Sequence, residues 1–282
     1  MVIGSHLILM YMGLVRSICL LIAMLSCHPG WAQERKSSDD FLDLFEPRNQ
    51  ISSQHILEFW GYHNNDGGGT YDDTLKLRYY QPLNIQGWRG TLRLDSSYVS
   101  NYGPSQPNQF SGQYQAGTTM MTIWGNPPDI FHQWNGTIGA RIIFPFGASG
   151  QWAAGPQIST IYKPMEGSKT AFSDFSPLAR YMYGFSNGNT TSSNSGQQPL
   201  LRSLYLFPTI GINLSPSTQI RFWDENGMVY NTAGGGWFVP IDAMITQRLT
   251  KHTLIAIGAA KQVVQTYSQY NWSFYGKLSM NF

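Results

Sequence analysis

The sequence predicts an all-β fold, a transmembrane antiparallel β-barrel of about twelve strands, with ten or fourteen strands left open. Short segments along the chain alternate between polar and apolar residues, which is typical of strands with one lipid-facing side. Only 12% of the residues are charged and 14% are aromatic. A soluble domain needs a more highly charged surface, whereas a barrel turns its outer belt to lipid. Beyond residue 32 no apolar run approaches the ~20 residues that a membrane helix requires.

The last ten residues, 273–282, show the alternation most clearly. One parity carries Phe274, Gly276, Leu278, Met280 and Phe282, and the other carries Ser273, Tyr275, Lys277, Ser279 and Asn281. A period of two places these sets on opposite faces of a strand. The terminal Phe282 resembles the tail by which bacterial outer-membrane proteins are presented for insertion. That resemblance implies the bacterial outer membrane as the location. It also implies the barrel-assembly machinery, outer-membrane lipid and lipopolysaccharide as partners.

The amino-terminal end fits an exported protein. Residues 1–32 combine a basic side chain, a short apolar run and small residues before Gln33, which predicts a signal peptide cut at that point. A lipoprotein cut before Cys27 is the alternative. A cut before Gln33 removes both cysteines and leaves the barrel without a disulfide. We expect residues 33–50 to form a periplasmic segment, which could act as a small plug, and residues 51–282 to form the barrel.

Twelve alternating segments are expected. They lie near 54–62, 74–82, 88–99, 115–124, 135–146, 150–163, 176–186, 201–213, 217–225, 235–247, 252–265 and 270–282. If the chain ends on the periplasmic side, the short links fall in the periplasm and the long polar links at 63–73, 101–114, 186–199 and 224–234 fall outside, as in known barrels. The links at 125–133 and 164–175 are long for periplasmic turns, so either could hide a further hairpin.

Charged residues inside strands are expected to face the lumen, because an exposed charge on the lipid side costs about 2–4 kcal/mol at the bilayer midplane. This rule selects Arg78, Arg93, Asp95, Arg141, Arg180, Arg221, Asp242 and Lys277. Six cations against two anions would attract anionic solutes. Tyr205, Phe207 and Phe238 would add an apolar path. The alternative is a filled interior in which arginine–aspartate pairs and tyrosine hydroxyls hold the barrel together.

Catalytic, metal and nucleic-acid signals are weak. No His-Glu-x-x-His motif occurs, and no catalytic residue, metal site or cofactor is predicted. His63 precedes Asn64, Asn65, Asp66 and three glycines, a cluster that could hold calcium but is more typical of an external turn. Removal of Arg16 with the signal leaves 17 basic and 16 acidic side chains. That balance argues against a nucleic-acid partner.

The carboxy-terminal third, residues 203–282, contains in order Leu206-Phe207-Pro208, Trp223, the run at 236–241 and the closing strand with Trp272. This order of elements resembles the barrel family named after the phenol-degradation MetA proteins, and residues 77–83 are similar as well. It implies a barrel of about twelve strands that takes up small hydrophobic or aromatic compounds. It implies no catalytic residues.

Passive passage of small solutes, aromatic or anionic, is therefore the expected function, and an enzyme is not expected. A non-conducting barrel that acts through its external loops, as an adhesin or antigen, is the first alternative. A lipid-modifying enzyme is the second.

Overall fold

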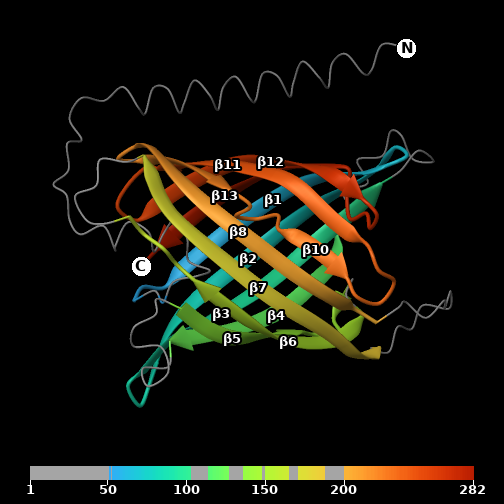
Figure 1. Cartoon of the computed structure of the whole chain (residues 1–282), viewed down its shortest axis with the longest axis horizontal. Coiled ribbons are helices and arrows are strands. Elements are labelled where there is room, and N and C mark those ends of the chain that lie inside the picture. Colours follow the sequence, from blue (N-terminus) through green and yellow to red (C-terminus); the bar gives the residue numbers. More distant parts are fainter. Residues whose placement is uncertain are drawn as a thin grey trace, which may run out of the picture. The chain divides into compact units, whose positions relative to one another are not determined.

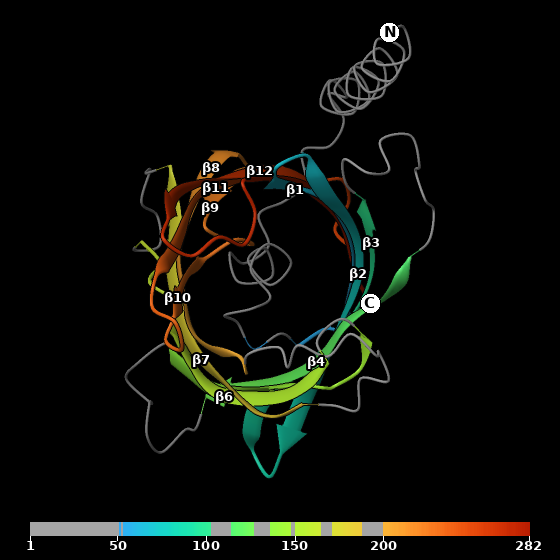
Figure 2. The same cartoon turned by 90° about the vertical axis from the view of Figure 1, so that its right-hand side faces the viewer.

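The described part of the chain is a closed antiparallel β-barrel. The computed structural model describes residues 51, 53–102, 114–126, 136–147, 150–164, 171–187 and 200–282. The strands cross one another obliquely in Figure 1, and Figure 2 shows them closing a ring. The predicted signal peptide (1–32) and periplasmic segment (33–50) lie outside the described residues. Within the described ranges no helix is both long enough and apolar enough to span a bilayer.

Thirteen strand segments of the described residues build the wall. They are β1 Ile56–Gly67, β2 Thr70–Ile85, β3 Trp88–Tyr102, β4 Gln115–Asn126, β5 Gly136–Ile143, β6 Gln151–Thr160, β7 Phe172–Asn187, β8 Arg202–Ser215, β9 Thr218–Phe222, β10 Met228–Asn231, β11 Trp237–Arg248, β12 Thr253–Gln265 and β13 Trp272–Asn281. From β1 to β9 each strand pairs with the next. The first and last strands pair antiparallel, from Ile56 opposite Asn281 to Asn65 opposite Trp272, and so remove both sheet edges.

Strands β9 and β10 are two halves of one wall position. Both pair with β8 on one side and with β11 on the other. The barrel therefore has twelve strand positions, as the sequence predicts. The prediction of an external loop at 224–234 is wrong, because residues 228–231 return to the wall as β10 and only 223–227 leave it. The turn-forming sequence Asp-Glu-Asn-Gly interrupts a strand instead of ending one.

The first hairpin also differs from expectation. We predicted a long external loop at 63–73, but β1 and β2 continue to Gly67 and from Thr70. Three successive glycines, Gly67, Gly68 and Gly69, adopt positive φ and make the tight turn. Of the two links suspected of hiding a hairpin, residues 127–135 and 165–170 lie outside the described residues.

Side chains alternate between the two faces as the period of two requires. In β11, Phe238, Asp242 and Met244 are buried while Ile241 and Ile245 are exposed. In β13, Ser273, Tyr275, Lys277 and Ser279 are buried, whereas Phe274 and Leu278 are exposed. The exposed face is thus aliphatic and aromatic, which suits contact with hydrocarbon.

The buried face carries large side chains as well as charges. One apolar cluster joins residues from β1, β2, β4 and β10 to β13, including Trp60, Tyr80, Trp124, Phe238 and Tyr275. Burial of an aliphatic or phenyl side chain of this kind contributes about 1.5–3 kcal/mol. The barrel interior is consequently packed with side chains along much of its wall.

Candidate functional site

The residues predicted to line the lumen lie on the buried face. Arg78, Arg93, Asp95, Arg180, Arg221, Asp242, Lys277 and Phe238 are buried, and Arg141, Tyr205 and Phe207 are half-buried. Their outward neighbours, such as Leu77 and Leu94, are exposed. Whether solutes travel along these side chains stays a prediction.

Strand register brings many of these side chains together. Arg78 lies opposite Asp95 across β2 and β3, and Tyr80 lies opposite Arg93. Thr122 of β4 then lies opposite Arg141 of β5. Opposed residues of an antiparallel pair have Cβ atoms about 4.5–5.5 Å apart. A row of polar groups therefore follows the wall across neighbouring strands.

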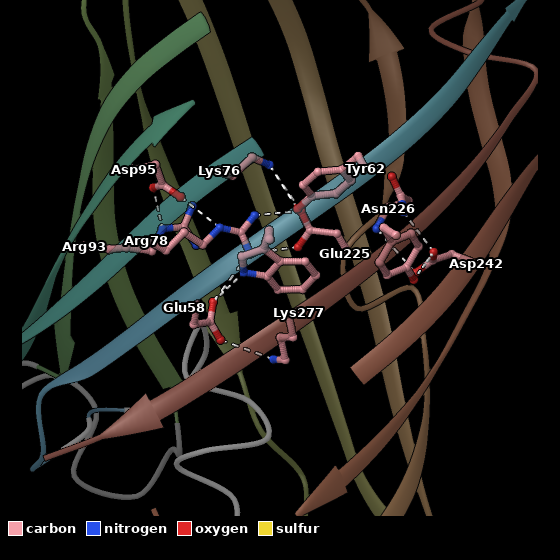
Figure 3. A network of polar contacts seen from close by, with 12 residues as sticks. Glu58, Tyr62, Lys76, Arg78, Arg93, Asp95, Glu225, Asn226, Asp242 and Lys277 are labelled. Carbon is pink, nitrogen blue, oxygen red and sulfur yellow. Dashed lines mark hydrogen bonds and ion pairs between the residues drawn. The ribbon is translucent and has the colours of Figure 1, made fainter. Parts of the chain in front are cut away.

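Arg78 is the centre of a network that the sequence predicted only in part (Figure 3). Its Nε atom donates to Asp95 Oδ1 at 2.9 Å. Its Nη1 and Nη2 atoms donate to the two carboxylate oxygens of Glu225 at 2.9 and 2.6 Å. Asp95 also accepts a 2.7 Å hydrogen bond from Arg93 Nε. Two-point pairing of this kind fixes the orientation of both groups.

Glu225 belongs to the interruption between β9 and β10 and reaches across the barrel. It accepts from Tyr62 on β1 at 2.6 Å, and Lys76 on β2 approaches to 3.5 Å. In the order of the sheet, β2 is five wall positions away from the β9–β10 position through β11, β12, β13 and β1. In a barrel of twelve positions that is nearly the opposite wall. The interruption therefore places a carboxylate from one side of the interior against cations of the other.

The interrupted segment has anchors of its own. The indole of Trp223 donates to the Pro240 carbonyl at 2.9 Å, and Thr209 donates to the Trp223 carbonyl at 2.9 Å. Asn226 donates to Asp242 from its side chain at 3.0 Å and from its backbone at 3.3 Å. Trp223 has φ 50°, a left-handed conformation that is strained for a bulky residue and persists only where surrounding contacts enforce it.

Glu58 forms a second centre on the wall. Lys277 Nζ donates to it at 3.2 Å, the Trp60 indole at 2.9 Å and the Tyr80 hydroxyl at 3.2 Å. Trp60 lies between two cations, since Arg78 sits 4.6 Å and Lys277 5.0 Å from its ring centre. These contacts join β13, β1 and β2, next to the seam that closes the barrel.

Arg221 forms a third centre near the other side of the ring. It donates to Asp174 through both terminal nitrogens at 3.1 Å, to Asp224 at 3.1 Å and to Gln219 at 2.8 Å. Ser176 donates a further hydrogen bond to Asp174. Every polar atom of this group is buried, so its pairing is essential to its stability.

The prediction of a positively charged interior left out several carboxylates. Glu58, Asp174, Asp224 and Glu225 all lie buried beside arginines or lysines. Glu58 could have been found, because it stands in a predicted strand where charges were expected to face inward. Asp174 fell in a segment that was read as a link, and Asp224 and Glu225 fell where the strand expected at 217–225 overlaps the link expected at 224–234. Ion pairs of the kind that the alternative requires are thus present in the interior.

Arg141 differs from the other inward arginines. Its Nε atom donates to Thr122 at 2.9 Å, and among the described residues no carboxylate lies within ion-pair distance. The charges of Arg93, Asp95 and Arg78 act on it from the neighbouring strands. Arg180 donates to Gln157 at 3.0 and 2.7 Å and sits 6.0 Å from the Phe207 ring centre. Arg141 therefore keeps a positive charge on this part of the wall.

Tyr270, between β12 and β13, adds a neutral polar group. Its ring packs edge-on against Phe238 at 4.9 Å, and its buried hydroxyl has no hydrogen-bond partner among the described residues. Burial raises the pKa of this hydroxyl, and the negative charges of Asp242 and Glu225 raise it further. Tyr270 therefore stays protonated and able to donate.

The described side chains around His63 do not form a metal site. Within the described ranges no group of three histidine, cysteine or carboxylate side chains could hold a metal ion. His63 pairs with Asp73 at 2.7 Å, and its ring stacks on Tyr71 with centroids 5.6 Å apart. Trp272 lies 5.4 Å away. An aromatic belt at the end of the strands accounts for this arrangement.

Comparison with known structures defines the class of the protein by its fold. The COG4313 outer membrane channel from Pseudomonas putida F1 matches with a TM-score of 0.58 and 11% identity, over 88% of this chain and 100% of that one. The NanC porin matches at 0.48 and 11%, over 79% and 98%. The β domain of the Bordetella autotransporter BrkA matches at 0.42 and 11%, over 81% and 99%. No family model and no curated protein matches. The chain has the fold of an outer-membrane β-barrel.

Proposed function

We propose that this protein is an outer-membrane channel through which small solutes, anionic or aromatic, pass by diffusion. The observation that carries the proposal is Arg141, which faces the interior of a closed barrel without a carboxylate partner among the described residues. A cation held in a low-dielectric wall attracts anions more strongly than one in bulk water. The similarity to an outer membrane channel in fold is consistent with this role.

Fewer residues attract anions than the sequence predicted. Arg93 and Arg221 are neutralised by Asp95 and Asp174, so Arg141 carries the electrostatic part of the mechanism. Tyr205 and Phe207 lie on the neighbouring strand β8, with Tyr205 opposite Arg180. They offer an apolar surface along which an aromatic solute can move.

Membership of the MetA-like family, export by the signal peptide and insertion by the barrel-assembly machinery are part of the same proposal. So is contact with outer-membrane lipid and lipopolysaccharide. The aliphatic outer face and the exposed terminal Phe282 support these points.

Conductance of the refolded protein in a planar bilayer tests the channel. A salt gradient should reveal anion preference, and the Arg141→Ala/Arg180→Ala variant should lose most of it. Lys251→Ala removes an exposed cation from the turn between β11 and β12 and should leave selectivity unchanged. A folded wild-type barrel that stays silent, or a double variant with unaltered selectivity, would contradict the proposal.

A second candidate function rests on the contact of Glu225 with Arg78 and Tyr62. An interior bridged in this way suits a non-conducting barrel that acts through its external loops. Deletion of 187–197 should abolish adhesion or antigenicity under this reading and should leave conductance intact under the first.

A further inference from the structure

The Glu225 carboxylate sits in what is chemically a carboxylate-binding site. Two nitrogens of Arg78 donate to its two oxygens, and the Tyr62 hydroxyl and the Lys76 ammonium approach one of them. All three donors belong to the continuous strands β1 and β2, whereas the carboxylate comes from the interrupted strand opposite. A planar guanidinium with a hydroxyl and an ammonium beside it is well suited to binding a carboxylate.

We propose that Arg78, Lys76 and Tyr62 bind the carboxylate group of a small solute, and that Glu225 occupies this site as an internal ligand which the solute displaces. The inference deepens the proposed channel function and rests on it. It assigns a substrate class, small carboxylates, and a means by which such a substrate removes the bridge across the interior.

Glu225 can leave the site without unfolding its segment. Trp223 and Asn226 hold that segment through Pro240 and Asp242, on β11, and neither contact involves Arg78. Release of the carboxylate from Arg78 therefore leaves these anchors in place. The Glu58–Lys277 pair is different, because it joins the adjacent strands β1 and β13 and has the geometry of a wall contact.

Release of Glu225 leaves positive charge for an incoming anion. Arg78 keeps Asp95 and Glu58, but Asp95 is shared with Arg93 and Glu58 with Lys277, and Lys76 has no other ion pair among the described residues. Buried cations left without a partner are costly, so a second carboxylate is strongly favoured there. Displacement is consequently an exchange of one ion pair for another.

Aromatic rings flank the site. Trp60 and Tyr62 stack with centroids 5.8 Å apart, and Tyr62 and Tyr275 stack at 6.0 Å. Lys76 lies 4.4 Å from the Tyr62 ring centre. A carboxylate attached to an aromatic ring can bind its charge at Arg78 and pack its ring on this surface. Benzoate is the matching probe, and benzamide is its neutral counterpart.

Calorimetric titration of benzoate into the refolded protein in detergent tests the site. A tethered carboxylate competes at a high effective concentration. Glu225→Gln should therefore bind benzoate about tenfold more tightly than the wild type. Benzamide should show no such gain. Addition of Arg78→Gln to the Glu225→Gln variant should abolish the gain.

Glu58→Gln is the matched control. It makes the same change of charge next to Arg78, whose Nη1 lies 3.8 Å from Glu58, but it removes no contact across the interior. Its benzoate affinity should stay near that of the wild type. Equal tightening in both variants, or no tightening in Glu225→Gln, would overturn the proposal. Heat-modifiability of electrophoretic mobility establishes folding. If the Glu225→Gln variant fails to fold, Glu225→Asp takes its place in the test. It keeps the charge but shortens the reach of the carboxylate, and it should also gain affinity for benzoate.

The two proposals fail in different ways. Calorimetry needs no ion flow, so a silent barrel that shows the gain keeps the carboxylate site and contradicts only the channel. A conducting barrel whose Glu225→Gln variant shows no gain keeps the channel and loses the site.

Discussion

Asp174 and Arg221 pair over a glycine of the strand that separates them. Asp174 lies on β7 and Arg221 on β9, and both are opposite Gly211 of β8 in the strand register. A Cβ atom at Gly211 would lie 2.5 Å from Asp174 Oδ1 and 2.9 Å from Arg221 Nη1. The absence of a side chain at this position is thus what allows the two charges to meet.

Gly211→Val should break this pair and destabilise the barrel by about 3–5 kcal/mol, the usual cost of separating a buried ion pair. Urea unfolding of the refolded protein, followed by tryptophan fluorescence, measures the loss. Gly61→Val is the control, because a Cβ at Gly61 meets nothing within 4 Å. If both variants lose similar stability, the pairing over Gly211 is not the cause.

Tyr275→Phe should cost about 1.5–3 kcal/mol, because the Tyr275 hydroxyl donates to the buried Asp242 carboxylate at 2.6 Å. Asn226 cannot fully replace that donor. Tyr98→Phe removes a hydroxyl from an exposed side chain and should change stability little. Thermal unfolding of the two variants provides the comparison, and equal midpoints would argue against a structural role for this hydrogen bond.

Ile257→Lys tests the orientation of the wall. Ile257 is 48% exposed in the middle of β12, so a lysine there should cost about 2–4 kcal/mol in a bilayer. Ile85→Lys places the same charge at the end of β2, where the cost should be about 0–1 kcal/mol. Folding efficiency into lipid vesicles reports the difference. A tolerated lysine at position 257 would mean that this face does not meet hydrocarbon.

Deletion of Phe282 should slow insertion by the barrel-assembly machinery more than spontaneous insertion. Phe282 exchanges two backbone hydrogen bonds with His55, at 3.2 and 3.0 Å, and stacks on its ring. Phe282 contributes little to the pairing that closes the barrel, since β1 and β13 pair from Ile56 onward. Insertion rates into vesicles with and without the purified machinery check the prediction. An equal effect in both would make Phe282 a structural residue only.

Local pattern was a good guide to the wall. In β11 the parity of Ile241 and Ile245 predicted the exposed face, and that of Asp242 and Phe238 the buried one. The same rule succeeded in β13. It failed at residues 224–234, because Asp-Glu-Asn-Gly has the composition of an external loop whether the chain turns outward or inward. The contacts of this segment with Asp242 and Arg78 decide that it turns inward. Arg78 is 147 residues from Glu225 in the chain.

The alternation of side chains, the twelve strand positions and the buried placement of the strand arginines follow from the order of residues, because a period of two acts within each strand and charge avoids lipid. The partners that arginines find across the interior do not follow from it. They depend on how closure between β1 and β13 sets opposite walls facing each other, and on whether a break in one strand folds into the interior. For the pair of Arg78 and Glu225, no window of neighbouring residues contains that information, since the two groups meet only after the barrel has closed.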